Sequence, residues 1–184
     1  MNLTAYVPRA VSPTQFVNFW CKHYHDPRHD IYVQNIGKPL NRQRARALIC
    51  WRSRTGYTKE QRAVIEKEFL ARIEVARAMP RATSAERWLE EFPRGGAMLR
   101  LFWLHIWQPR RFPLFDSHIY RASCHVLGLA HQSPSKLGEV GQIRFYIDHY
   151  LGLYQCFEGL DARKVEPALH ALGLFLTRYG FPND

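Results

Sequence analysis

The chain has 184 residues, of which 46% are hydrophobic and 14% aromatic, and its formal net charge is +10 at pH 7. This composition excludes a disordered chain, because burial of so much apolar surface offsets the entropy that ordering costs. No apolar run reaches the roughly 20 residues that cross a bilayer, and the start MNLTAYVPRAV lacks the features of a secretory signal, so we expect a cytoplasmic protein without a membrane partner.

The length suits one domain, and we expect residues 1–184 to form it. Ser12 followed by Pro13 predicts the start of an amphipathic helix. We expect the aromatic residues of this helix to share one face, namely Phe16, Phe19 and Trp20. The residues from Asp26 to Pro39 then predict an irregular loop, because prolines and a glycine lie among polar side chains.

Two capped helices are predicted next. Asn41 can cap a helix that continues to about Arg52. Thr58 and Gln61 form a capping box, which predicts a longer helix to about Met79.

The middle of the chain also predicts helices. Thr83 and Glu86 form a second capping box, for a short helix that ends near Phe92. Residues 97–107 are apolar almost all round, which indicates a helix buried on most sides. Asp116 then opens another helix, which ends at about Gly128.

The last third predicts two more helices and completes an all-α fold. An aromatic helix covers residues 137–157, with a bend near Gly152. Asp161 caps the final helix. The side chains expected on its inner face are Val165, Ala168, Leu169, Leu172, Leu176 and Tyr179.

The cysteines and histidines give no metal or redox motif. The four cysteines are far apart, and we expect them to be free, buried thiols: Cys21, Cys50, Cys124 and Cys156. A short stretch also contains His23, His25 and His29 with Asp26 and Asp30, but its spacing suits neither a helical pair of ligands nor a zinc knuckle. We therefore expect no metal.

Two motifs give the first two functional signals. Residues 92–96 read Phe-Pro-Arg-Gly-Gly, and residues 115–121 read Phe-Asp-Ser-His-Ile-Tyr-Arg. With the apolar stretch between them they resemble the helix-hairpin-helix DNA glycosylases, most closely endonuclease III and its adenine- and alkylated-base-excising relatives. The resemblance covers residues 92–122, within a core of that fold at about 83–130.

The resemblance implies that Asp116 is catalytic. In that family this aspartate caps its helix and its carboxylate stabilises the positive sugar of a flipped-out nucleotide as the base departs. A helix cap without catalysis is the simpler reading of the residue. His118 would follow in the first turn, either packed against a neighbouring helix or at the DNA, and Arg121 either supports the helix or faces a phosphate.

The hairpin implies contact with double-stranded DNA. Glycines at Gly95 and Gly96 allow a positive φ and a close approach to the duplex, while amides at the start of the next helix can donate to a phosphate. Arg94 replaces the first glycine of the family pattern and could itself contact phosphate. A helix-helix turn that simply needs glycine is the alternative.

The pattern also lacks two features of the bifunctional relatives. Met98 stands where their nucleophilic lysine is expected, so a catalytic protein would use water and would have no lyase activity. No cysteine follows Cys156, so the iron-sulfur cluster of endonuclease III is missing, and we expect no cofactor.

A basic stretch between Arg42 and Arg62 is the third functional signal. Its residues Arg42 and Arg46 are expected on the outside of their helix, suited either to a duplex backbone or to solvent. Three aromatic residues near it either stack on an extruded base or belong to the core: Tyr32, Trp51 and Tyr57. The leading hypothesis is a monofunctional DNA glycosylase. The alternatives are a catalytically inactive, DNA-binding form of the same fold and a protein-interaction module.

Overall fold

A computed structural model describes residues 11–53, 55–130 and 133–179, and within these ranges every regular element is a helix. The all-α prediction is confirmed. None of the described helices has the length and apolar character that a membrane span requires.

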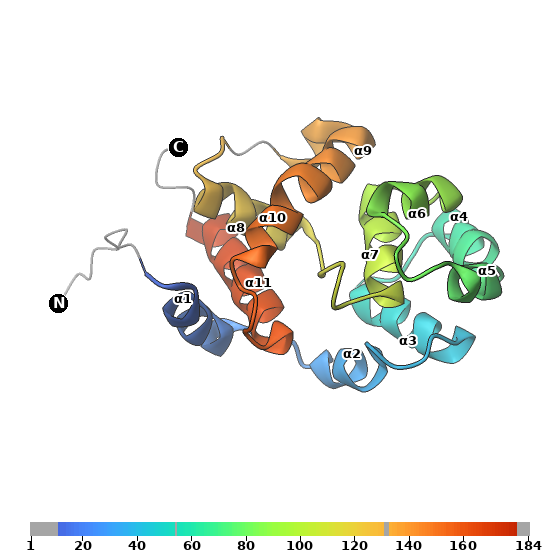
Figure 1. Ribbon diagram of the computed structural model, residues 1–184, viewed down its shortest axis with the longest axis horizontal. Coiled ribbons are helices and arrows are strands. Elements are labelled where there is room, and N and C mark those ends of the chain that lie inside the picture. Colours follow the sequence, from blue (N-terminus) through green and yellow to red (C-terminus); the bar gives the residue numbers. More distant parts are fainter. Residues whose placement is uncertain (1–10, 54, 131–132, 180–184) are drawn as a thin grey trace.

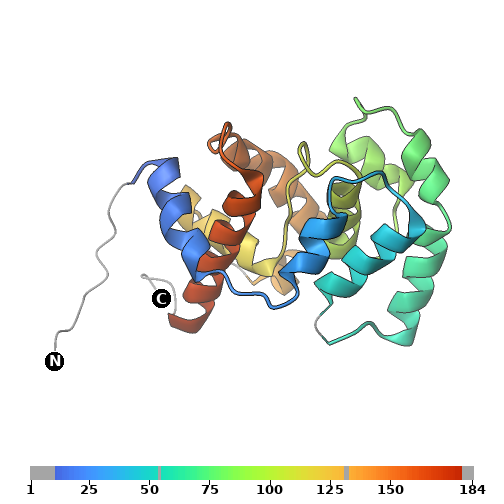
Figure 2. The ribbon, with the colours of Figure 1, turned by 90° about the horizontal axis from the view of Figure 1, so that it is seen from below.

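The helices form two groups on either side of the segment that joins α7 to α8 (Figures 1 and 2). The group that contains both ends of the described chain consists of α1 (Pro13–Trp20), the turn η1 (Cys21–His23), α8 (Ser117–Leu127), the π-helical turn η3 (Tyr146–Tyr150), α10 (Leu151–Gln155) and α11 (Ala162–Tyr179). The other group consists of α3 (Arg42–Arg52), α4 (Lys59–Val64), the π-helical turn η2 (Ile65–Leu70), α5 (Ile73–Ala78), α6 (Ala85–Glu91) and α7 (Ala97–Trp107). Two helices connect the groups: α2 (His29–Asn35) packs on α3, and α9 (Pro134–Phe145) packs on α7.

The core is continuous through both groups. Buried side chains from α6 and α7, such as Trp88 and Phe102, belong to the same hydrophobic cluster as Tyr120 of α8 and Leu169 of α11. Helix α7 lies at its centre, as its sequence predicted, since every residue from Leu101 to Ile106 is buried.

The predicted helix starts depend on local hydrogen bonds, and most are confirmed. Ser12 and Thr58 form capping boxes, and the Asn41 side chain accepts the amide hydrogen of Arg44. Asp161 accepts the amide hydrogen of Arg163 in the same way. The cap of α6 is one residue from the predicted position, because Ser84 rather than Thr83 accepts from the first turn.

The predicted loop from Asp26 to Pro39 is wrong, because it contains α2. Two apolar side chains of this helix, Ile31 and Val33, are exposed, so its sequence shows no clear apolar face. Tyr32 is buried and its ring lies 4.5 Å from that of Trp51. Contacts with α3 therefore stabilise a helix that local signals do not indicate.

Two predicted long helices are interrupted by π-helical turns. In the first, η2 separates α4 from α5 and places consecutive side chains, Glu68, Phe69 and Leu70, in the interior. In the second, the bend lies at Gly138, where φ is +65°, and at η3 rather than at Gly152. The turn η3 lets the hydroxyls of Tyr146 and Tyr150 donate to the carbonyls of residues 113 and 114 at 3.2 and 2.8 Å.

Some predicted interior positions are wrong. Tyr179 is 73% exposed, and the thiols of Cys50 and Cys156 lie on the surface, whereas Cys124 is buried. Phe19, expected on the same face as Trp20, is 56% exposed, whereas Trp20 is buried. The four cysteines are free, as predicted.

Candidate functional site

Asp116 caps α8, as the sequence predicted. Its Oδ1 atom accepts the amide hydrogens of His118 and Ile119, each at 2.8 Å, and its backbone is extended, as an N-cap requires. One oxygen of the carboxylate is therefore fixed by the helix that it opens.

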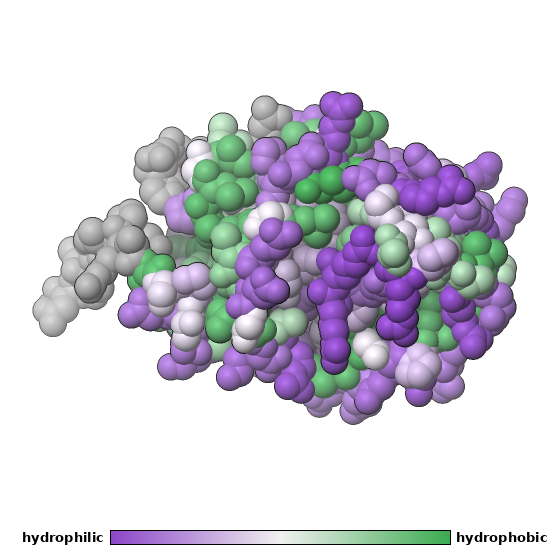
Figure 3. All heavy atoms as spheres, in the orientation of Figure 1, coloured by the Kyte–Doolittle hydropathy of each residue, from purple (hydrophilic) through white to green (hydrophobic). Residues whose placement is uncertain are grey.

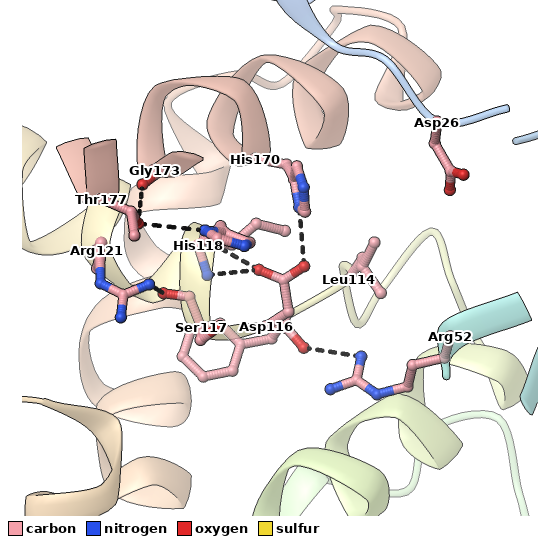
Figure 4. A network of polar contacts seen from close by, with 12 residues as sticks. Asp26, Arg52, Leu114, Asp116, Ser117, His118, Arg121, His170, Gly173 and Thr177 are labelled. Atoms are coloured by element: carbon pink, nitrogen blue, oxygen red, sulfur yellow. Dashed lines mark hydrogen bonds and ion pairs between the residues drawn. The ribbon is translucent and has the colours of Figure 1, made fainter. Parts of the chain in front are cut away.

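The other oxygen of Asp116 is bound by a residue that the sequence analysis missed. The Nδ1 atom of His170, on α11, lies 2.9 Å from Asp116 Oδ2 (Figure 4). Burial alone would raise the pKa of Asp116, but the hydrogen bond and charge of His170, the Ile119 amide and the charge of Arg52 outweigh it and lower the pKa. The carboxyl group is therefore ionised at neutral pH.

Asp116 lines a cavity of about 340 Å³. The walls come from both groups of helices and from the connecting helix α2: Tyr32 of α2, Trp51 and Arg52 of α3, and Glu166 and His170 of α11. Sites for small molecules have volumes of roughly 300 to 1,000 Å³, so the cavity is large enough to hold a ligand.

Arg52 is the cation of this cavity. Its Nη1 atom donates to the carbonyl of Phe115 at 3.4 Å, on the side of Asp116 away from His170 (Figure 4), and its guanidinium carbon lies 4.8 Å from the ring centre of Phe102. Burial lowers the pKa of Arg52, and the negative charge of Asp116 opposes that shift. In the sequence Arg52 was only one member of a basic stretch, because nothing local distinguishes it.

A second cavity, of about 390 Å³, lies against the glycine hairpin. Gly95 and Gly96 line it, and it shares Arg52 and Met98 with the cavity of Asp116. The two motifs of the sequence are therefore brought to neighbouring cavities with a common wall.

The hairpin has the backbone geometry that its glycines predicted. The φ angles are +113° at Gly95 and +74° at Gly96, and Gly96 is the N-cap residue of α7. A Cβ atom at position 95 would lie 3.0 Å from the ring of Phe69, a fully buried side chain that would have to shift by a few tenths of an ångström.

Gly95→Ala is expected to lower the free energy of unfolding by about 2 kcal/mol, because the positive φ and the Phe69 contact both oppose a side chain. Gly128→Ala is the matched control, with φ at +64° and open space around it, and should cost about 1 kcal/mol. Urea denaturation of both variants measures the difference. Equal losses would show that the contact with Phe69 has no energetic role.

The remaining predicted site residues lie outside the two cavities, except for His118. His118 lines the cavity of Asp116, with its ring 4.7 Å from that of His170, and burial lowers its pKa. Arg121 lies one turn further along α8 and its Nη1 atom is 3.5 Å from the carbonyl of Ser117. Three predicted DNA-binding arginines are exposed and face acidic side chains: Arg42 and Arg46 both pair with Glu66, and Arg94 lies 3.8 Å from Glu68.

The histidine-rich stretch contributes to the cavity wall. His29 and Asp26 line the cavity, and Asp26 accepts a hydrogen bond from the indole nitrogen of Trp51 at 2.9 Å. Over the described ranges, no three histidine, cysteine or acidic side chains are grouped as a metal would need.

A buried polar network connects Tyr32, Leu114 and Glu166 of the cavity wall to His105 behind it. The Tyr32 hydroxyl donates to Glu166 Oε2 and contacts His105 Nε2, both at 2.8 Å, and Glu166 Oε1 accepts the amide hydrogen of Leu114, also at 2.8 Å. Burial and the charge of Glu166 raise the pKa of Tyr32, so the hydroxyl keeps its proton. The network joins α2, α7, α11 and the segment before Asp116, and so fixes the distance between the cavity walls.

Tyr32→Phe is expected to lower the free energy of unfolding by about 2 to 3 kcal/mol, because it leaves a buried carboxylate oxygen and a buried imidazole nitrogen short of a partner. Tyr57→Phe is the control, since it removes only a hydroxyl bonded to the carbonyl of Ile49, and should cost about 1 kcal/mol. Thermal and urea denaturation measure both. A Tyr32 variant no weaker than the Tyr57 variant would contradict the assigned role of the network.

Comparison of this chain with protein-family models, with curated proteins and with solved structures found no match. Its function is therefore inferred from the cavity itself. An ionised carboxylate bonded to an imidazole, beside a guanidinium and aromatic rings, can stabilise a developing positive charge and accept a proton from water.

Proposed function

We propose that this protein binds double-stranded DNA and hydrolyses the N-glycosidic bond of a damaged or modified nucleotide, without cleaving the strand. The observation that supports this most is the position of Asp116: an ionised carboxylate on the wall of a cavity of about 340 Å³. The resemblance of residues 92–122 to the helix-hairpin-helix DNA glycosylases gives the same residue the central role.

In the proposed reaction the bond between the base nitrogen and sugar C1′ breaks, and its electron pair leaves with the base. Asp116 stabilises the positive charge that develops on the sugar. The oxygen of a water molecule then bonds to C1′ and loses a proton. His170 can accept that proton at Nε2 when its Nδ1 atom carries the hydrogen donated to Asp116.

The proposed DNA contact depends on charge and on the hairpin. A net charge of +10 favours association with phosphates through release of their counterions. Hydrophilic side chains cover most of the face in Figure 3, with hydrophobic patches between them. Arg42 and Arg46 share a single carboxylate, that of Glu66, so this pair keeps a net positive charge for a phosphate. Arg94, Arg121 and the amides after Gly96 are the other proposed contacts.

A second candidate is a binding module that uses the same fold without chemistry. The observation that favours it is that Asp116 already accepts three hydrogen bonds, two from its own helix and one from His170. In this candidate the carboxylate has no role beyond these bonds: it caps α8 and holds α11 against it. The partner would then be DNA, or another protein if the basic surface has no role with phosphate.

The test is base release from a panel of duplexes that carry oxidised, deaminated, alkylated or mismatched bases, with the protein in excess. We expect release from at least one duplex, leaving abasic strands that break only after alkali treatment, because Met98 offers no amine for lyase chemistry. Salt-dependent duplex binding with no release from any duplex would refute the enzyme and favour the DNA-binding module. Absence of both would favour the protein-interaction module.

A further inference from the structure

Outside the two cavities, aromatic side chains of α1 and α11 form an exposed surface. Among the phenylalanines, tyrosines and tryptophans that the structure describes, only Phe19 and Tyr179 are exposed. Phe19 lies on α1 and Tyr179 is the last residue of α11. These two helices pack against each other at the end of the molecule opposite α3 to α6 (Figures 1 and 2). The two exposed rings therefore belong to the same part of the surface.

Ring contacts join Phe19 to Tyr179 across the two helices. The ring centre of Phe19 lies 5.2 Å from that of Trp20, which lies 5.4 Å from that of Phe175. The Phe175 ring in turn lies 4.8 Å from that of Tyr179. His23 of η1, which is exposed, lies 5.1 Å from Phe19 on the other side. We call these rings the aromatic row. Since Trp20 is part of the hydrophobic core, the exposed rings at both ends are attached to a fixed base.

The helices around the aromatic row carry positive charge and no carboxylate. Residues 11–25, 117–130 and 167–179 contain no aspartate or glutamate. These ranges include α1, η1, α8 and the C-terminal half of α11, and α11 packs on the other three. Lys22 and Arg178 are exposed, next in sequence to His23 and Tyr179, and neither has an ion-pair partner among the described residues. Positive charge that no carboxylate neutralises therefore lies beside exposed rings.

We infer that the aromatic row binds single-stranded nucleic acid, with bases stacked on the rings and phosphates beside Lys22 and Arg178. Every base has a flat face that stacks on an aromatic side chain, and a single strand exposes these faces whereas a duplex hides them. A surface without carboxylates attracts phosphates through release of their counterions. The same charge disfavours a second copy of this chain as the partner, because two positive surfaces repel each other.

The site is separate from the proposed glycosylase, because none of its residues lines the cavity of Asp116. Its ligand is a single strand, whereas the proposed reaction uses a duplex. The two proposals therefore have separate tests.

The test measures binding of the full chain to labelled oligothymidylate and oligouridylate of about 12 nucleotides, by fluorescence anisotropy at low salt. We expect both single strands to bind. Phe19→Ala combined with Tyr179→Ala should weaken this binding by about tenfold or more, because stacking on both exposed rings is lost. Phe19→Tyr combined with Tyr179→Phe is the matched control: it keeps both rings and should bind as the unaltered protein does. Circular dichroism checks that both variants fold.

A second pair of variants tests the charges. Lys22→Gln combined with Arg178→Gln should weaken single-strand binding several-fold and make it less dependent on salt, because fewer counterions are released. Arg77→Gln combined with Arg87→Gln is the control, since these exposed arginines of α5 and α6 are paired with glutamates outside the aromatic row. It should change neither the affinity nor the salt dependence.

Single-strand binding that the double alanine variant retains would overturn the inference, as would absence of binding to both oligonucleotides. Two other results would also overturn it by assigning the aromatic row to a different partner. One is binding to phosphatidylglycerol vesicles but not to single strands, and the other is a dimer in sedimentation that the double alanine variant no longer forms. Failure of the proposed function is distinguishable, because base release from duplexes should be equal in the unaltered protein and the double alanine variant. Absence of release from every duplex, with single strands still bound at the aromatic row, would refute the glycosylase alone.

Discussion

Asp116→Asn is expected to lower the rate of base release by about 100-fold or more, because the variant removes the charge that faces the developing sugar cation. The fold should tolerate the change. Asparagine caps helices as well as aspartate does, and its Oδ1 atom can still accept the amide hydrogens of His118 and Ile119. Single-turnover release from the best duplex of the panel measures the effect, and urea denaturation measures the stability.

Two further variants separate the role of the charge from that of the cap. Asp116→Ala removes both, so it should be as slow as the asparagine variant and also less stable by about 1 kcal/mol. His170→Gln removes the imidazole but leaves the Asp116 carboxylate and its cap, and should slow release by a smaller factor, with a changed pH profile. Release by Asp116→Asn at the rate of the unaltered protein would show that the carboxylate is a helix cap and nothing more.

The sequence predicted those parts of the fold that depend on neighbouring residues. The caps at Ser12, Asn41, Thr58 and Asp116 each involve a side chain and an amide within three residues, so they can be read from spacing. The left-handed Gly128 at the end of α8 is likewise a local signal. Helix α2 and the two π-helical turns depend instead on distant partners, such as the carbonyls that Tyr146 and Tyr150 reach.

The residues of the candidate site also fall into two kinds: those that neighbouring residues reveal and those that only distant contacts reveal. Asp116 was found because a motif surrounds it, and Gly95 and Gly96 because glycines in a hairpin are distinctive. His170 lies 54 residues from its partner Asp116, and Glu166 lies 52 residues from Leu114. Both lie on α11, whose sequence shows only the pattern of an amphipathic core helix. Their roles therefore become visible only once the packing of α11 against α8 is known.

That placement depends on Gly173. Helices α8 and α11 approach so closely that a Cβ atom at position 173 would lie 1.8 Å from the carbonyl oxygen of His118 and 2.4 Å from its carbonyl carbon. Both atoms belong to the backbone of α8, so no side-chain rotation can relieve the clash. The same approach brings His170, one turn earlier on α11, to Asp116. Glycine at this position therefore sets the geometry of the proposed site as well as the packing of the two helices.

Gly173→Ala is accordingly expected to cost about 3 kcal/mol or more in the free energy of unfolding, because the two helices must separate and expose apolar surface. Gly152→Ala is the matched control: this glycine is also helical, but nothing lies within 4 Å of an added Cβ, so alanine should be neutral or stabilise α10 by up to about 1 kcal/mol. Circular dichroism with urea denaturation compares the two. If the Gly173 variant accumulates in folded form, the separation of α11 from α8 should also weaken the contact between His170 and Asp116 and slow base release. A Gly173 variant as stable as the unaltered protein would mean that α8 and α11 do not approach as closely as described, and the assignment of His170 to the site would fall with it.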